Sequence, residues 1–244
     1  MKTPNTTHSL IVNNLFLVLC ILNIISPANA AMQISDAIIF FEPGKPSRHD
    51  MTVFNPDDEN LYVKVEVYEV KNPGLPNEEK VTITSPEEFS LLITPNKLLV
   101  PPNSQKTIRL LSVMPPGETE RVYRATVTPV TGKAVATQSG IKLMIAYGVL
   151  IFVQPEKPNA ELVVTRTGTK FHVKNIGNTN TVLTKGKQCS GTQAKGKDIE
   201  KNDCLELKSK RLYAGEEWTQ DLPMDGPVEY TLKTGNKFSV VQYP

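Results

Sequence analysis

A two-residue alternation of apolar and polar side chains is the feature that most limits how this chain can fold. Over most of the segment Leu61–Val70 (LYVKVEVYEV) the residues alternate. One side has Leu61, Val63, Val65 and Val67, and the other has Tyr62, Lys64 and Glu66. Successive side chains of a β-strand point to opposite faces, so this pattern predicts a half-buried antiparallel strand. No segment after residue 30 has a convincing helical periodicity, and the fold class is therefore predicted to be all-β.

Short strand-like segments recur along the chain at roughly 8–12-residue spacing, separated by turn clusters such as Asn55–Asp58. The sequence Gln154–Pro158 (QPEKP) has the composition of a hinge. On each side of it lies a part of the mature chain close to the ~100 residues of one immunoglobulin-type sandwich. We therefore predict two immunoglobulin-like β-sandwich domains, residues 31–156 and 157–244.

Residues 1–30 have the layout of a secretory signal peptide. Lys2 supplies a positive charge, an apolar stretch runs from Leu10 to Ile25, and Ala28–Ala30 provides a small-residue cleavage site. The apolar stretch is shorter than the ~20 residues that a membrane span needs, which disfavours the alternative of a transmembrane anchor. We expect cleavage at Ala30 or Ala31, and an exported protein that does not insert into a membrane.

Two cysteines, Cys189 and Cys204, remain once Cys20 has left with the signal. An even pair in an exported chain predicts a disulfide, which here would close a short local loop. A metal site is the alternative, but no His lies near either cysteine and their spacing is too wide for a C-x-x-C unit. The sequence predicts neither a metal nor another cofactor.

Charge and motifs argue against several classes of function. Lys and Arg total 27 against 25 Asp and Glu, without the basic excess of a nucleic-acid binder. The sequence has no G-x-S-x-G elbow, H-E-x-x-H motif, P-loop or dinucleotide fingerprint, so no enzymatic activity is expected. An exported carbohydrate-binding adhesin with two sandwiches is an alternative. Such a protein should carry clustered aromatic residues, whereas Trp218 is the only tryptophan.

The run Ile141–Val153 (IKLMIAYGVLIFV) is the longest apolar stretch after the signal. Every odd position carries a large apolar residue, and the even positions change from polar or small to fully apolar near Leu150. From periodicity alone, a central strand covered on both faces is the safer interpretation. The alternative is that the first half lies at an exposed edge, where it adds a strand to a partner protein.

Four segments together resemble the periplasmic pilus chaperones of the chaperone–usher pathway, and most closely the alternate, or alpha, class that assembles colonisation-factor pili. They are Ile93–Leu110 (ITPNKLLVPPNSQKTIRL), Glu120–Arg124 (ERVYR), Lys142–Pro155 and Lys174–Asn178 (KNIGN). They resemble, in order, the D–E region, the opening of strand F, the donor strand G and an early turn of the second domain. The resemblance implies a boomerang-shaped pair of immunoglobulin-like domains.

The resemblance also implies a function without chemistry. A periplasmic chaperone of this kind binds fimbrial subunits by donor-strand complementation and delivers them to an outer-membrane usher. The donor residues would be Ile141, Leu143, Ile145 and Tyr147. The sequence leaves open whether the free protein caps this edge by forming a homodimer.

In the better-known members of the family, an Arg and a Lys bind the carboxylate at the subunit's C-terminus. The positions in this chain that match them hold the apolar residues Ile38 and Leu150. A substitute should be basic and close to the cleft between the domains, and Arg suits a carboxylate because its fork binds both oxygens. The candidates, in falling order, are Arg124, Arg109 and Arg121. For Arg109 we favour a different role, an ion pair with Glu120 that braces the two domains.

Overall fold

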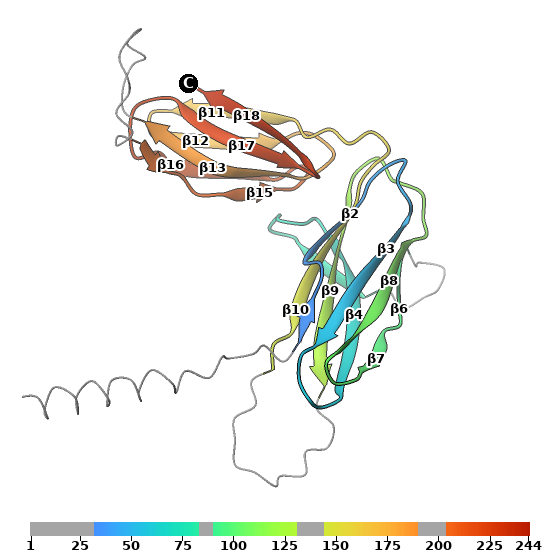
Figure 1. The fold of residues 1–244 in the computed structure, drawn as a ribbon. Coiled ribbons are helices and arrows are strands. Elements are labelled where there is room, and N and C mark those ends of the chain that lie inside the picture. Colours follow the sequence, from blue (N-terminus) through green and yellow to red (C-terminus); the bar gives the residue numbers. More distant parts are fainter. Residues whose placement is uncertain (1–31, 83–89, 131–143, 190–203) are drawn as a thin grey trace, which may run out of the picture.

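The computed structural model describes residues 32–82, 90–130, 144–189 and 204–244. Its strands form four sheets that pack as two sandwiches, bent against each other like the arms of a boomerang (Figure 1). In these ranges the chain forms no helix, and hence no helix of the length and hydropathy needed to cross a membrane. The all-β fold class is confirmed.

The N-terminal sandwich contains the first ten strands. They are β1 (Gln33–Ile34), β2 (Ile38–Phe41), β3 (Arg48–Asn55), β4 (Leu61–Lys71), β5 (Glu79–Thr82), β6 (Leu91–Thr94), β7 (Lys97–Val100), β8 (Ser104–Ser112), β9 (Arg121–Val130) and β10 (Tyr147–Val153). One sheet has the order β1-β3-β8-β6. The other has the order β2-β10-β9-β4-β5, with β7 also paired to β4.

Strand β4 confirms the alternation read from the sequence. Val63 and Val65 are buried in the core between the two sheets, whereas Tyr62, Lys64 and Glu66 are exposed. Towards the hinge end of the strand this simple pattern stops, because the outward face there is covered as well. A second apolar cluster lies on that face, and it matters for the site described below.

The apolar segment Met32–Phe41 has the composition of a single strand, but it is divided in the structure. Its first part, β1, pairs antiparallel with β3 in one sheet. The chain then crosses over at residues 35–37, and β2 pairs parallel with β10 in the other sheet. One segment therefore contributes an edge strand to both layers of the sandwich, a crossing that the alternation pattern alone does not reveal.

The C-terminal sandwich contains the remaining eight strands. They are β11 (Leu162–Thr167), β12 (Lys170–Asn175), β13 (Thr181–Cys189), β14 (Cys204–Glu206), β15 (Lys210–Leu212), β16 (Glu217–Asp221), β17 (Val228–Thr234) and β18 (Lys237–Tyr243). The sheets have the orders β11-β12-β16 and β14-β13-β17-β18, with β15 paired to β13. A core that includes Phe171, Leu183 and Tyr230 fills the space between them.

The predicted disulfide between Cys189 and Cys204 is confirmed, and it joins β13 to β14. The predicted domain boundary after residue 156 falls in the connection between Val153, at the end of β10, and Leu162, at the start of β11. Among the described residues, no strand of one sandwich pairs with a strand of the other. The two arms are held together by side chains and loop contacts instead.

Candidate functional site

Strand β10 has a free edge along its first residues. On one side, β9 pairs with the full length of β10. On the other side, β2 pairs only with the second half, Leu150–Val153, and the Leu150 N–H also donates to the Ala37 carbonyl at 2.9 Å. Within the described part of the chain, no strand pairs with this outer edge at residues 147–149. Backbone donors and acceptors are therefore available there for an added strand.

The odd-numbered side chains of β10 point into the core of the N-terminal sandwich. Val149 and Ile151 are fully buried. Tyr147, which was predicted to be part of the donor surface, is half-buried against the same core, and its hydroxyl donates to the Met32 carbonyl at 2.8 Å. In this structure Tyr147 thus packs within its own domain.

Upstream of Tyr147, the next odd-numbered side chain, that of Ile145, lies outside the core. Ile145 is 43% exposed, although it continues the odd-numbered series that is buried further along the strand. The other two predicted donor residues, Ile141 and Leu143, lie outside the described residues. The apolar series therefore extends from the protein's own core to its surface at the free edge.

The even-numbered side of β10 explains why the sequence becomes apolar on both faces after Leu150. Phe152 is fully buried beneath the C-terminal sandwich. Its ring stacks on Phe40 at 5.0 Å between centroids and lies 6.4 Å from the ring of Tyr213. The guanidinium of Arg211 lies over the Phe152 ring, 4.9 Å from its centroid. Residues 150–153 are therefore covered on both faces, whereas residues 147–149 have an open edge.

The two positions that match the usual basic residues lie side by side. Ile38 of β2 is directly opposite Leu150 of β10, and Leu150 is directly opposite Arg124 of β9. Side chains directly opposite each other in a sheet share a face, so these three residues form one row across the outward face. The row lies next to Phe152, at the junction with the C-terminal sandwich, and it marks the point where the free edge of β10 begins.

Arg124 is partly accessible, with 34% of its side-chain surface exposed. One nitrogen of its guanidinium lies 3.7 Å from a carboxylate oxygen of Glu78, in the hairpin between β4 and β5. Glu78 lies in the segment Asn72–Glu79 (NPGLPNEE), whose Pro, Gly and Asn residues indicate only a loop and whose charges look solvated. Nothing in the linear sequence signals that this loop bends over the sheet towards Arg124.

Arg121 has a local structural role. Its guanidinium donates to the Pro115 carbonyl at 2.8 Å and to the Met114 carbonyl at 3.5 Å, which anchors the loop between β8 and β9. The Nε atom of Arg121 is buried without a hydrogen-bond partner in the structure. These contacts use Arg121 within its own sandwich rather than at the row of Arg124.

Arg109 lies on β8, in the sheet that does not contain β10. It donates to both carboxylate oxygens of Asp50 at 2.8 and 3.1 Å, and Arg48 donates to the same carboxylate. These hydrogen bonds from Arg109 and Arg48 hold the pKa of Asp50 well below its usual range. The predicted ion pair between Arg109 and Glu120 is therefore wrong, because Arg109 is committed to Asp50.

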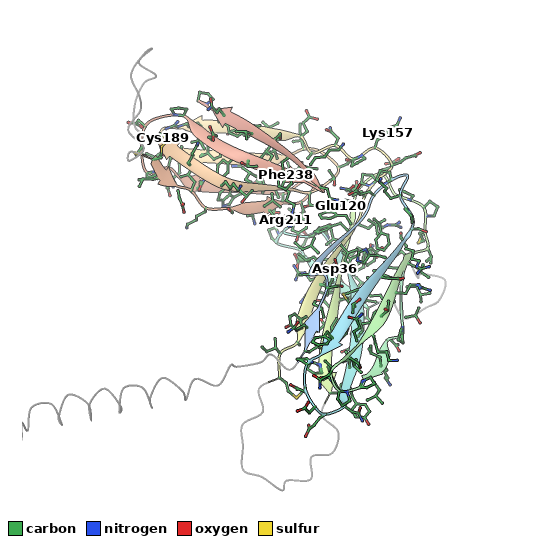
Figure 2. The ribbon with its side chains drawn as sticks, viewed as in Figure 1. Asp36, Glu120, Lys157, Cys189, Arg211 and Phe238 are labelled. Atoms are coloured by element: carbon green, nitrogen blue, oxygen red, sulfur yellow. A yellow bond between two sulfur atoms is a disulfide. The ribbon has the colours of Figure 1, made fainter. Side chains whose placement is uncertain are left out.

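Glu120 does brace the two sandwiches, but its hydrogen-bond partners are the uncharged groups of Thr179 and Asn180. The hydroxyl of Thr179 donates to its carboxylate at 2.6 Å, and the backbone and side-chain N–H groups of Asn180 donate at 3.0 and 2.7 Å. Burial raises the pKa of Glu120 above its usual value, although these hydrogen bonds act in the opposite direction. Figure 2 shows Glu120 and Arg211 at the junction between the arms.

Metal-binding clusters are absent from the ranges that the structure describes, where no three His, Cys, Asp or Glu residues gather closely enough to hold an ion. The features that stand out are a free strand edge, an exposed aliphatic residue beside it and an accessible Arg nearby. Such a surface can bind an extended apolar polypeptide segment that ends in a carboxylate.

Comparison with known protein families gives one match that covers about half of the chain. Residues 31–159 match the model for the pili and flagellar-assembly chaperone, PapD N-terminal domain. A curated relative from Escherichia coli, the CFA/I fimbrial A subunit, is 30% identical over 135 residues, which is 52% of this chain and 56% of that protein. The chain thus aligns with little more than half the length of this relative.

Solved structures share the two-domain architecture. The class 5 fimbriae chaperone CfaA is 22% identical, with a TM-score of 0.62 over 86% of this chain and 98% of that one. The structure of the Salmonella enterica SafA pilin in complex with the SafB chaperone is also similar. It has 16% identity and a TM-score of 0.59, over 89% of this chain and 98% of the matched chain. At these identities the likeness establishes the fold, which is the predicted pair of immunoglobulin-like domains.

Proposed function

Because this chain belongs to the family of pili and flagellar-assembly chaperones, we propose that it holds fimbrial subunits by donating a strand to them. The donated strand is the segment before β10, with Ile141, Leu143 and Ile145 filling an open groove of the subunit. The complex then passes to an outer-membrane usher, where another strand replaces the donated one. The reaction is an exchange of β-strand partners, so the chain needs neither a catalytic residue nor a cofactor.

The free edge of β10 is the observation that carries this proposal. A strand added beside residues 147–149 would continue the sheet in the position that β2 occupies further along. The apolar series of odd-numbered residues would then pass from the chaperone's own core into the core of the subunit. Chaperone–pilin complexes are a known case of such strand addition, in which backbone hydrogen bonds give affinity and alternate side chains give specificity.

Of the three donor residues, Ile145 is the one whose side chain the structure describes. Burial of a large aliphatic side chain contributes roughly 1.5–3 kcal/mol, so three of them supply several kcal/mol before ordering costs. Tyr147 already packs against the chaperone's own core. We therefore assign Tyr147 to the transition between the two cores rather than to the subunit's groove.

We assign the subunit's carboxylate to Arg124. A strand that ran along the free edge would have to stop where β2 begins, which is the row of Ile38, Leu150 and Arg124. Neighbouring strands are about 4.8 Å apart, so the end of the added strand would lie about 10 Å from the Arg124 backbone. An extended Arg side chain can span most of that distance. Arg109 lies in the other sheet, and Arg121 is bound to carbonyls of its own loop.

The proposed location is the periplasm, reached through the signal peptide predicted at residues 1–30, which lie outside the described part of the chain. The family membership supports this location. The adhesin alternative receives no support from Trp218, because this side chain packs against the core of the C-terminal sandwich rather than forming a surface for stacking sugars.

Co-purification from cells that also express candidate fimbrial subunits tests the proposal. The double variant Leu143→Asp/Ile145→Asp should fold as the wild type does, and it should lose the subunit because charged groups cannot enter an apolar groove. The matched control is Val163→Asp, which places the same charge on an exposed aliphatic position of the C-terminal sandwich. Retention of the subunit by the double variant would refute the donor-strand assignment.

A further inference from the structure

The hairpin between β4 and β5 reaches both arms of the molecule. Its Glu78 carboxylate lies 3.7 Å from the Arg124 guanidinium and accepts a hydrogen bond from the Gly74 N–H at 2.8 Å. At the tip of the hairpin, Gly74 lies against Glu216 of the C-terminal sandwich. A Cβ atom at Gly74 would be 2.5 Å from a carboxylate oxygen of Glu216. The hairpin therefore bridges the candidate anchor and the second sandwich.

We propose that Glu78 is an internal carboxylate that occupies Arg124 until the carboxylate at a subunit's C-terminus displaces it. This inference rests on the proposed role of Arg124 as the anchor. Glu78 has the same charged group as the C-terminus of a polypeptide chain. Both carboxylates favour the same guanidinium, so binding of one competes with binding of the other.

The ion pair between Glu78 and Arg124 is weak enough for another carboxylate to take the place of Glu78. The separation of 3.7 Å exceeds the 2.7–3.2 Å of a hydrogen bond, so the attraction is mainly Coulombic. The side chains are 27% and 34% exposed, and water weakens ion pairs in such positions. A carboxylate carried by a bound strand can bind Arg in the two-bond geometry and displace Glu78.

The position of Glu78 is set by contacts on the other arm. Glu216 is buried, its carboxylate lies 2.6 Å from the Lys210 ammonium, and it accepts a hydrogen bond from the Tyr213 N–H at 3.0 Å. The tip of the hairpin thus rests on a fixed surface, and the Gly74 N–H holds one oxygen of Glu78. This arrangement keeps the carboxylate near Arg124 in the unloaded protein.

A competition experiment tests the proposal. Wild type and Glu78→Gln carry different affinity tags and are co-expressed with a limiting amount of the fimbrial subunit that the wild type retains in the co-purification assay. We expect Glu78→Gln to capture about two to five times as much subunit, which is the range for removal of one partly exposed ion pair. Glu79→Gln, a change of the same kind at the next exposed residue, should capture as much as the wild type.

The same competition in an Arg124→Ala background separates this proposal from the proposed function. There, Glu78→Gln should give no advantage, because the group that it frees is gone. If Arg124→Ala weakens capture but Glu78→Gln in the wild-type background captures no more subunit than the wild type, the internal carboxylate is refuted and the anchor stands. If Arg124→Ala leaves capture unchanged, the anchor and the internal carboxylate both fail, and strand donation stands. If the wild type retains no subunit, the proposed function fails with them.

Discussion

The hydroxyl of Thr179, in the C-terminal sandwich, donates a 2.6 Å hydrogen bond to the carboxylate of Glu120, in the N-terminal sandwich. Two further hydrogen bonds reinforce this link. The Glu120 N–H donates to the Asn178 carbonyl at 2.9 Å, and the Asn178 side-chain amide donates to the Glu118 carbonyl at 3.0 Å. The angle between the arms is therefore fixed by hydrogen bonds at the junction as well as by apolar packing. Three predictions test the contacts at the junction between the arms.

The first prediction concerns pH. Burial raises the pKa of Glu120 in the folded protein above the value of 4.5 that the group has without this environment. Between pH 4.5 and the raised pKa, the folded state binds more protons than the unfolded state, so the free energy of unfolding falls as pH rises. The contribution is complete below pH 4.5 and is lost as pH rises through the raised pKa. Glu120→Gln should remove this part of the pH dependence, measured by guanidinium unfolding at several pH values.

A matched variant gives the control for Glu120. Glu120→Ala should lower the free energy of unfolding by about 1–3 kcal/mol, because Thr179 and Asn180 lose their acceptor in a buried place. Gln keeps an acceptor for Asn180 and can donate to the Thr179 hydroxyl, so it should be much less destabilising. Equal losses for Ala and Gln at neutral pH would mean that the charge of Glu120 is itself the stabilising element, contrary to the raised pKa.

The second prediction concerns the docking of the hairpin at Gly74. Gly74 has a φ of +77°, and a side chain there would displace the Glu216 carboxylate from Lys210 and the Tyr213 N–H. Gly44 has a φ of +72° with open space around it, so Gly44→Ala measures the backbone cost alone. Gly74→Ala should destabilise the protein by about 1 kcal/mol more than Gly44→Ala in denaturant unfolding. Equal costs would show that the contact with Glu216 adds nothing.

The third prediction concerns the aromatic cluster at the junction. Phe152→Ala should lower the free energy of unfolding by about 3–5 kcal/mol, because a fully buried ring leaves a cavity beside Phe40 and Arg211. It should also loosen the angle between the arms, which small-angle X-ray scattering would detect as a broader distribution of distances. Phe238→Ala is the control. That ring is 64% exposed, and its loss should change stability by no more than ~0.5 kcal/mol.

Much of the fold follows from local patterns. The alternation in Leu61–Val70 predicted β4 and its buried face correctly, and the even pair of cysteines in an exported chain predicted the disulfide between Cys189 and Cys204. The alternation pattern does not reveal β5, β7 and β16, which are only four or five residues long. Segments of this length carry too few alternations to be told apart from loops, and their pairing with a neighbouring strand is what makes them strands.

Part of the candidate site could also be predicted from the sequence, and part could not. The run Ile141–Val153 stood out in the sequence because its even positions become apolar near Leu150. In the structure, β2 and β9 flank residues 150–153, whereas only β9 pairs with residues 147–149. Arg124 could be named from a resemblance, but the roles of Arg109 and Glu120 could not. Each of these residues had several possible partners in the sequence, and only the assembled sheets show that Arg109 meets Asp50 and Glu120 meets Thr179.

The sequence by itself determined the all-β class, the hinge, the cysteine pair and the presence of one strand too apolar for an ordinary sandwich edge. These are properties of neighbouring residues, and short-range periodicity records them. The tertiary structure decided that residues 150–153 of that strand are flanked on both sides, which Arg lies beside its free edge, and that the loop containing Glu78 reaches this Arg. Those facts depend on contacts between residues far apart in the chain, such as Phe152 with Tyr213, and on the way two sandwiches pack against each other.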